Sequence, residues 1–225
     1  MKNIFTQRFH RTIEKQVQDF LSSHPNFLSQ QTINSPRAVG DAIQTVLEKN
    51  FREIVDNALG TDASTKEPSA SFTRRAMADI AFYDKDNNYY VVDVKTHRLD
   101  TEFNMPNLTS VERLSRLYED DKNNFVILKI DYEIMNKKFA IKRTLFRPIE
   151  FFAWSCLTLG ALGWGQIQIA NANEIEVKES YSRKEWMLEM CDRLFEFYPK
   201  EIEKINERIG HFQKVRAFWK DKNLW

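Results

Sequence analysis

The chain has 225 residues and a formal net charge of +1, from 33 basic and 32 acidic side chains. This balance excludes a surface that is basic all over and binds polyanions without selectivity, although it permits a local basic cleft. With 42% hydrophobic and 13% aromatic residues, the sequence can fill the core of one sizeable α/β domain, so we expect a single domain over residues 1–225.

Cysteine content and hydropathy narrow the class of protein further. Cys156 and Cys191 lie far apart and form no CxxC motif, so neither a zinc site nor a disulfide framework is expected. No apolar stretch is long enough to span a membrane, and no apolar N-terminal run precedes a cleavage site. We therefore expect a soluble protein of the reducing cytoplasm, without a membrane partner.

The N-terminal part, residues 1–34, is predicted to hold one amphipathic helix and a polar connection. Its apolar side chains recur every three or four residues, as on a helix face that packs in a core or a subunit interface. They are Phe5, Phe9, Ile13, Val17, Phe20 and Leu21. A second helix is predicted from Pro36, which Ser35 can cap, as far as Gly60. The Ser- and Thr-rich residues 61–73 then predict a mobile loop.

The central feature of the sequence is a predicted β-hairpin. Residues 80–83 and 89–94 are mostly apolar, β-branched or aromatic, and residues 84–88 between them are rich in the Asp and Asn of tight turns. Asp79 and Asp93 lie about equally far from the centre of this turn. The pairing register is therefore expected to bring their carboxylates together.

Two carboxylates beside a lysine at the end of an apolar strand predict a metal site. Side chains alternate along a strand, so Asp93 and Lys95 point to one face and Val94 points into the core. Carboxylate oxygens and a backbone carbonyl, here that of Val94, suit a hard cation such as Mg²⁺. Lys95 could then orient or deprotonate an attacking water. The alternative for this pattern is an ordinary ion pair on the surface.

The next part of the chain alternates helix and strand patterns. A helix is predicted from about residue 108 to 118, and buried strands are predicted at 125–130 and 139–146, paired with each other. The aromatic segment 149–157 is predicted to be a core helix. This order of elements is typical of an α/β fold.

The last two features are a glycine-rich segment and a helical C-terminus. Three glycines up to Gly165 precede the run Gln-Ile-Gln-Ile at 166–169, whose isoleucines are expected to face one side and its glutamines the other. Such glycines let the backbone approach a partner closely, and a plain hinge before an edge strand is the alternative. Residues 182–225 are predicted to be helical, with a capping box at the start, a break at Pro199 and no heptad repeat.

The hairpin residues resemble the signature of the PD-(D/E)xK nucleases. Asp79 matches the first acidic position and Asp93-Val94-Lys95 the second acid and the lysine, with Ala78 in place of the family's frequent proline. The resemblance extends over roughly residues 36–219 to type II restriction endonucleases of the HincII, HpaI and EcoRV group. The three matching blocks are Asp93-Val94-Lys95-Thr96, Met105-Pro106-Asn107-Leu108-Thr109-Ser110 and Gly165-Gln166-Ile167-Gln168-Ile169.

The resemblance implies a restriction-endonuclease fold, which is an α/β fold with a mixed central β-sheet flanked by helices. It also implies Mg²⁺-dependent cleavage of double-stranded DNA at a palindrome, leaving 5′-phosphates and blunt ends. The enzyme would be a homodimer with a companion DNA methyltransferase that acts on the same site. A target with GT and AC outer pairs and a longer A·T-only target, as in rare cutters such as SwaI, both fit. A repair or recombination nuclease of the same superfamily and a DNA-binding protein that does not cleave are the alternatives.

The resemblance also assigns roles around the metal. The residues expected to be catalytic are Asp79, Asp93 and Lys95. Both carboxylates and the backbone carbonyl of Val94 are expected to hold Mg²⁺. A third acidic or polar residue is expected from the second helix, where Gln44 stands at a position at which the group often has Glu, with Asp41 nearby. By spacing alone, both of these residues also fit a solvated helix face.

Residues that contact DNA are expected in three places. The segment before the helix at 108–118 offers amide side chains, which read base edges, and residues 159–168 match the loop and strand that read the target in the resembled group. The expected residues are Asn104, Asn107, Thr109, Gly163, Gly165, Gln166 and Gln168. Arg74 and Arg75, shortly before the hairpin, are expected to contact phosphates. A capped loop and simply exposed arginines are the corresponding alternatives.

Overall fold

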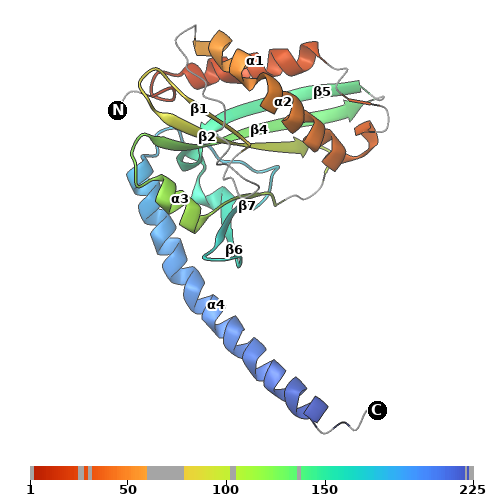
Figure 1. The fold of residues 1–225 in the computed structure, drawn as a ribbon, viewed down its shortest axis with the longest axis vertical. Coiled ribbons are helices and arrows are strands. Elements are labelled where there is room, and N and C mark those ends of the chain that lie inside the picture. The colour runs from red at the N-terminus through yellow and green to blue at the C-terminus, as the bar shows by residue number, and fades with distance from the viewer. Residues whose placement is uncertain are drawn as a thin grey trace. The chain divides into compact units, whose positions relative to one another are not determined.

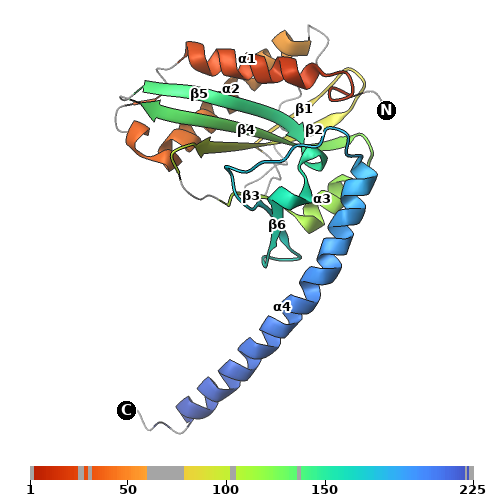
Figure 2. The same ribbon diagram turned by 180° about the vertical axis from the view of Figure 1, so that it is seen from behind.

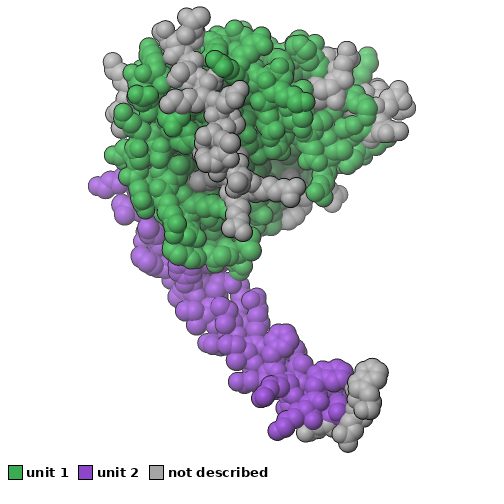
Figure 3. All heavy atoms as spheres, viewed as in Figure 1, with its two compact units in different colours: residues 1–180 green, residues 181–225 purple. Residues whose placement is uncertain are grey.

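The computed structural model describes residues 3–24, 28–29, 32–59, 79–101, 105–135, 138–220 and 222. The chain divides into two compact units, Met1–Ser180 and Tyr181–Trp225 (Figure 3). In the described residues, the first unit holds two β-sheets and three α-helices, and the second holds one long helix. That the chain folds as a single domain stays a prediction.

A four-stranded mixed sheet forms the centre of the first unit. Its order is β1 (Ile80–Tyr83), β2 (Tyr89–Arg98), β4 (Asn123–Met135) and β5 (Lys138–Pro148). β2 runs antiparallel to β1 and parallel to β4, and β4 runs antiparallel to β5. The predicted hairpin and the predicted pairing of the two later strands are therefore confirmed, and so is the mixed α/β architecture.

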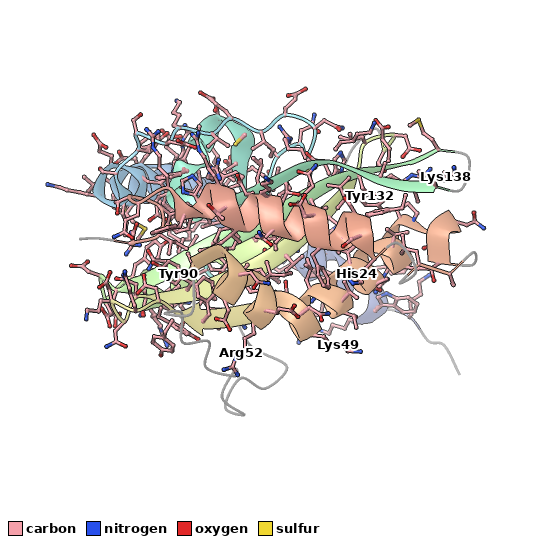
Figure 4. The ribbon with its side chains drawn as sticks, turned by 90° about the horizontal axis from the view of Figure 1, so that it is seen from above. His24, Lys49, Arg52, Tyr90, Tyr132 and Lys138 are labelled. Carbon is pink, nitrogen blue, oxygen red and sulfur yellow. The ribbon has the colours of Figure 1, made fainter. Side chains whose placement is uncertain are left out.

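Two helices cover one face of this sheet, α1 (Phe9–Ser23) and α2 (Pro36–Leu59), as Figures 1 and 4 show. Most of the predicted stripe of α1 is buried: Ile13, Val17 and Leu21 have no exposed surface, whereas Phe9 at the start of the helix is 37% exposed. It packs in one cluster with alternate residues of β2 and β4, which point to the same face of the sheet. These strand residues are Val92, Val94, Val126, Leu128 and Ile130. The stripe of α1 therefore belongs to the core of the first unit.

A second sheet has three antiparallel strands and lies beyond the four-stranded sheet, away from α1 and α2 (Figures 1 and 2). Its order is β3 (Asn107–Ser110), β7 (Gln166–Ile169) and β6 (Leu157–Gly160). The helix predicted from residue 108 begins only at 111, as α3 (Val111–Leu117), because the residues before it pair with β7. Ser110, the last residue of β3, caps α3 by accepting a hydrogen bond from the N–H of Arg113.

The aromatic segment 149–157 was predicted to be a core helix, and the helix is wrong although the core position is right. The segment forms two short 3-10 helices, Ile149–Phe151 and Trp154–Cys156, and then enters β6. Phe152 between them is extended and pairs with Val177 in an isolated β-bridge. Aromatic side chains lose rotamer freedom in a helix, so an extended connection that buries them competes well.

The second unit is the helix α4 (Arg183–Lys220). It starts at the predicted capping box, in which the N–H of Glu185 donates to Ser182 Oγ (3.2 Å) and the N–H of Ser182 donates to Glu185 Oε2 (3.1 Å). The break predicted at Pro199 is absent. Proline removes only one N–H, and water can bond the carbonyl left without a donor where the helix is exposed. Among the described residues, no helix is both long and apolar enough to cross a membrane.

Candidate functional site

The turn between β1 and β2 decides which residues face each other in the hairpin. Asp84 closes this turn, because its Oδ1 accepts the backbone N–H of Asn88 at 2.9 Å. In the resulting register, the first pair of β1 is Ile80 with Val92, and Asp79 directly precedes this strand. The N–H of Asp79 also donates to the carbonyl of Val92, at 3.1 Å, so Asp79 and Ile80 both lie against Val92, as at a β-bulge. Asp79 and Asp93 line the same cavity, so the two carboxylates lie close together, as predicted.

Asp79 is held from two sides. Its Oδ2 accepts the backbone N–H of Val94 at 2.7 Å, and its Oδ1 accepts a hydrogen bond from Gln44 Nε2, also at 2.7 Å. The first bond comes from β2 and the second from α2, so two elements of the core fix the orientation of one carboxylate. Charge-assisted hydrogen bonds of this length are among the stronger ones in proteins.

The path of α2 over the sheet explains why Gln44 reaches the carboxylates. At Gly40 the helix passes so close to β2 that a Cβ atom would lie 2.6 Å from Thr96 Oγ1. Gln44 follows one turn later and points to Asp79, while its amide also donates to Glu48 at 3.0 Å. Asp41 lines a neighbouring cavity instead. Of the two polar residues expected from this helix, Gln44 is therefore the one that bonds a carboxylate of the site, that of Asp79.

Asp93 carries the unusual electrostatics of the site. Its Oδ1 accepts a hydrogen bond from Lys95 Nζ at 2.8 Å, but its Oδ2 is buried and has no hydrogen-bond partner. Burial raises the pKa of Asp93 from 3.8 to about 7, although Lys95 opposes this shift. A buried carboxylate oxygen without a partner is costly in a folded protein, and such groups cluster at functional sites.

The oxygen atoms present fit a hard cation. Asp79 and Asp93 line one cavity, and the Oδ2 of Asp93 is a strong acceptor without a hydrogen-bond partner among the described residues. In the described part of the chain, no three His, Cys, Asp or Glu side chains gather closely enough to hold a metal. Mg²⁺ needs no such cluster, because it keeps several waters and uses one or two carboxylates. The backbone carbonyl of Val94 stays a predicted third ligand.

Two cavities open at the site. One, of about 470 Å³, is lined by Asp79 and Asp93 together with residues of β3, α3 and the connection from β6 to β7. The other, of about 430 Å³, is lined by Lys95 and Gln44 together with other residues of α2 and β2. The two carboxylates therefore face a space bordered by the small sheet, and the lysine faces a space bordered by α2.

Most of the residues predicted to contact DNA lie along the first cavity and the small sheet. Thr109, Gly163 and Gln166 line the cavity with the two carboxylates. Asn107 and Gln168 face each other on β3 and β7, and Gln168 Nε2 donates to Asn107 Oδ1. The predicted alternation along β7 is confirmed, because its isoleucines are buried and its glutamines are only half-buried.

The glycines before β7 have different tasks. Gly163 and Gly165 adopt φ angles of 60° and 121°, a region that disfavours any residue with a Cβ. The carbonyl of Gly165 accepts the N–H of Val111 at 3.0 Å, so this glycine ties the start of α3 to the small sheet. Gly165 is thus structural and Gly163 borders the cavity. Asn104, Arg74 and Arg75 lie outside the described residues.

Two residues of α3 that line the first cavity, Glu112 and Arg113, were not expected from the sequence. Leu162 and Trp164 also line it and lie in the segment 159–168 that was expected to read the target, although neither was named individually. Leu162 is 65% and Trp164 58% exposed, and apolar side chains in a tight turn were a signal that the sequence did contain. Arg113 gave no signal, because a basic residue on a short helix looks like any solvated position.

A buried ion pair lies beside the site on β4. Lys129 stands opposite Lys95 in the register of the two parallel strands and is only 1% exposed. Its ammonium donates to Asp131, which also accepts a hydrogen bond from Arg143 Nε at 2.8 Å. Burial lowers the pKa of Lys129, while Asp131 opposes the shift. Lys129 is thus paired within its own strand, as Lys95 is paired with Asp93.

No protein-family model matches the chain, and a comparison with curated protein sequences finds no relative. The chemistry of the site itself must therefore indicate what the protein does. That chemistry is a pair of neighbouring carboxylates on an open cavity, one of them with an unsatisfied buried oxygen and a lysine beside it.

Proposed function

We propose that the protein is a Mg²⁺-dependent deoxyribonuclease with a restriction-endonuclease fold, which cleaves both strands of a palindromic DNA duplex. The observation that carries this proposal is the register of the hairpin. The hairpin brings Asp79 and Asp93 to the border of one cavity and places Lys95 Nζ 2.8 Å from the carboxylate of Asp93. This is the arrangement that the resemblance to PD-(D/E)xK nucleases requires.

The cation would be held by Asp79, Asp93 and the carbonyl of Val94. When bound, it supplies a water of lowered pKa and neutralises charge on the scissile phosphate. The chain's own residues prepare the place. Gln44 and the N–H of Val94 fix Asp79, so that its carboxylate is already oriented before a ligand arrives. Lys95 Nζ donates a hydrogen bond to Asp93 Oδ1. The same ammonium group can stabilise the negative charge that develops on a phosphate bound at the two carboxylates.

The borders of the first cavity suit a nucleic acid. Gln166 and Thr109 offer polar groups that can bond base edges, and Arg113 offers a cation for a phosphate. The exposed Leu162 and Trp164 lie on the same border and can stack against bases or sugars. A polyanion would thus approach the two carboxylates across the small sheet, where the sequence places its amide side chains.

The proposed function implies two protein partners, a second copy of the chain and a DNA methyltransferase. A palindrome has a two-fold axis, and one set of Asp79, Asp93 and Lys95 cuts one strand at a time, so a homodimer would supply the second set. The cleavage would fall at the centre of the site and leave blunt ends with 5′-phosphates. A DNA methyltransferase that modifies the same sequence would protect the host's DNA.

Incubation of the purified protein with plasmid DNA and Mg²⁺ tests the proposal. Discrete linear fragments support restriction. Nicking that depends on DNA structure would instead indicate a repair nuclease, and intact plasmid of retarded mobility would indicate a protein that binds without cleaving.

Matched variants tie the activity to the site. Asp93→Asn and Lys95→Ala should abolish cleavage and leave DNA binding measurable. Asp19→Asn makes the same chemical change at an exposed position of α1 and should cleave as the wild type does. Wild-type cleavage rates in either site variant would remove the proposed active site.

A further inference from the structure

The long helix α4 exposes a continuous row of apolar side chains. Nine large apolar side chains of α4 are between 38% and 73% exposed, and all of them except Phe218 fall in this row. The eight in the row are Leu188, Phe195, Tyr198, Ile202, Ile205, Ile209, Phe212 and Trp219. At a rise of 1.5 Å per residue, the row is about 46 Å long. A monomeric protein rarely leaves so long an apolar row in water.

The row follows a heptad repeat, contrary to the expectation of none. When Cys191 and Arg216 are included, the positions of the row are separated by three and four residues in turn. This is the spacing of the a and d positions of a coiled coil. The expected break at Pro199 concealed this repeat, because two separate helices would not share one seam. From 201 to 213, the flanking e and g positions are polar, so the apolar row is narrow there. They are Glu201, Asn206, Arg208 and Gln213.

A narrow seam of this kind requires a partner that is itself an apolar helix face. The described residues of the first unit offer no such face, since the stripes of α1 and α2 are buried in its core. Its large exposed apolar side chains are scattered over separate segments. They are Phe9, Met105, Met135, Leu162 and Trp164. Among the described elements, only α4 carries a matching row.

We propose that α4 pairs with the α4 helix of a second copy of the chain, as a two-stranded coiled coil along this seam. The available area suffices: at roughly 100 Å² per exposed side chain, eight side chains give roughly 800 Å² per copy, which is what each partner contributes to a stable interface of standard size. Ile202 and Ile209 occupy successive a positions with Ile205 at the d position between them, and a two-fold pair is the commonest symmetric assembly of identical chains. The pairing goes beyond the proposed nuclease activity and does not depend on it.

Light scattering after size-exclusion chromatography tests this proposal on the full chain over a wide range of concentrations. The wild type should be a dimer. Ile202→Gln combined with Ile209→Gln removes four buried isoleucines per dimer and should raise the dimer dissociation constant by at least ~1,000-fold. Glutamine is a good helix former, so helicity in far-ultraviolet circular dichroism should be kept.

A control variant changes two residues to glutamine on the opposite side of the same helix. Lys200→Gln combined with Lys214→Gln lies at f positions and should leave the dimer intact. A monomeric wild type at high micromolar concentration, including one that binds lipid vesicles instead, would overturn the proposal. So would a dimer that the isoleucine variant leaves unchanged. DNA cleavage is scored separately, so a dimer without nuclease activity refutes the function and keeps the seam.

Discussion

The substitution Asp93→Asn should stabilise the metal-free protein while it abolishes the proposed cleavage. Asp93 is 6% exposed, its Oδ2 has no partner, and burial raises its pKa from 3.8 to about 7. A folded-state pKa above the unfolded value means that the folded protein binds the proton more tightly. Ionisation of Asp93 therefore costs stability as the pH rises from about 4 to about 7, and the full cost remains above that range.

The size of the effect follows from this pKa shift. Each pKa unit corresponds to about 1.4 kcal/mol, so the cost approaches about 4 kcal/mol at pH 8 and is about 2 kcal/mol at pH 5. Asparagine has nearly the same shape, never ionises, and keeps an oxygen that can accept from Lys95 Nζ. The stabilisation by Asp93→Asn should therefore be greater at pH 8 than at pH 5 by roughly 2–3 kcal/mol.

Urea unfolding at the two pH values, with a chelator present, measures this difference. Asp19→Asn serves as the control, because Asp19 is exposed on α1 and its change should alter stability by less than about 0.5 kcal/mol. Added Mg²⁺ should reverse the order, since it stabilises the wild type and not the variant. A stabilisation that is equal at both pH values, or a variant less stable at pH 8, would refute the electrostatic reasoning.

Three further predictions follow from the same structure. Asp131→Asn should destabilise the fold by about 3 kcal/mol in urea unfolding, because it leaves the buried Lys129 without its carboxylate; an unchanged midpoint would contradict this. Apparent Mg²⁺ affinity, measured by calorimetry, should weaken about tenfold per pH unit below pH 7, because the cation competes with the proton on Asp93; equal affinity at pH 5 and pH 8 would exclude that competition. Gln168→Ala should lose about 1–3 kcal/mol more affinity for the target than for random DNA in competition binding; equal losses would reassign Gln168 to the DNA backbone.

The hairpin could be predicted because the features that form it are local in sequence. The turn residues, the two apolar runs and the equal distances of Asp79 and Asp93 from the turn are all visible in about twenty residues. Long-range packing was not visible in this way. Gln44 reaches Asp79 only because α2 crosses β2 closely at Gly40, and no periodicity in the sequence encodes that approach.

Three other differences have physical causes that a local pattern does not contain. Strand β4 was predicted to be buried from its apolar residues, and its lysine, Lys129, is buried with them. The burial is possible because Asp131, two residues later on the same strand, compensates the charge of Lys129. The segment 149–157 has the apolar content of a core helix, but a bridge to Val177 from far along the chain keeps Phe152 extended. A proline breaks a helix that is buried in a core more strongly than one that is exposed, because water can bond the carbonyl that proline leaves without a donor. Pro199 lies in the exposed part of α4, so the helix continues through it.

Sequencing the DNA ends after digestion of genomic DNA with the wild-type protein and Mg²⁺ tests the central claim most directly. We predict that the ends share one palindrome, are cut at its centre, and carry 5′-phosphates. The same reaction with Asp93→Asn should leave the DNA intact although the variant still binds it. Ends without a common sequence would contradict the assignment as a restriction endonuclease, and equal cleavage by Asp93→Asn would contradict the proposed active site itself.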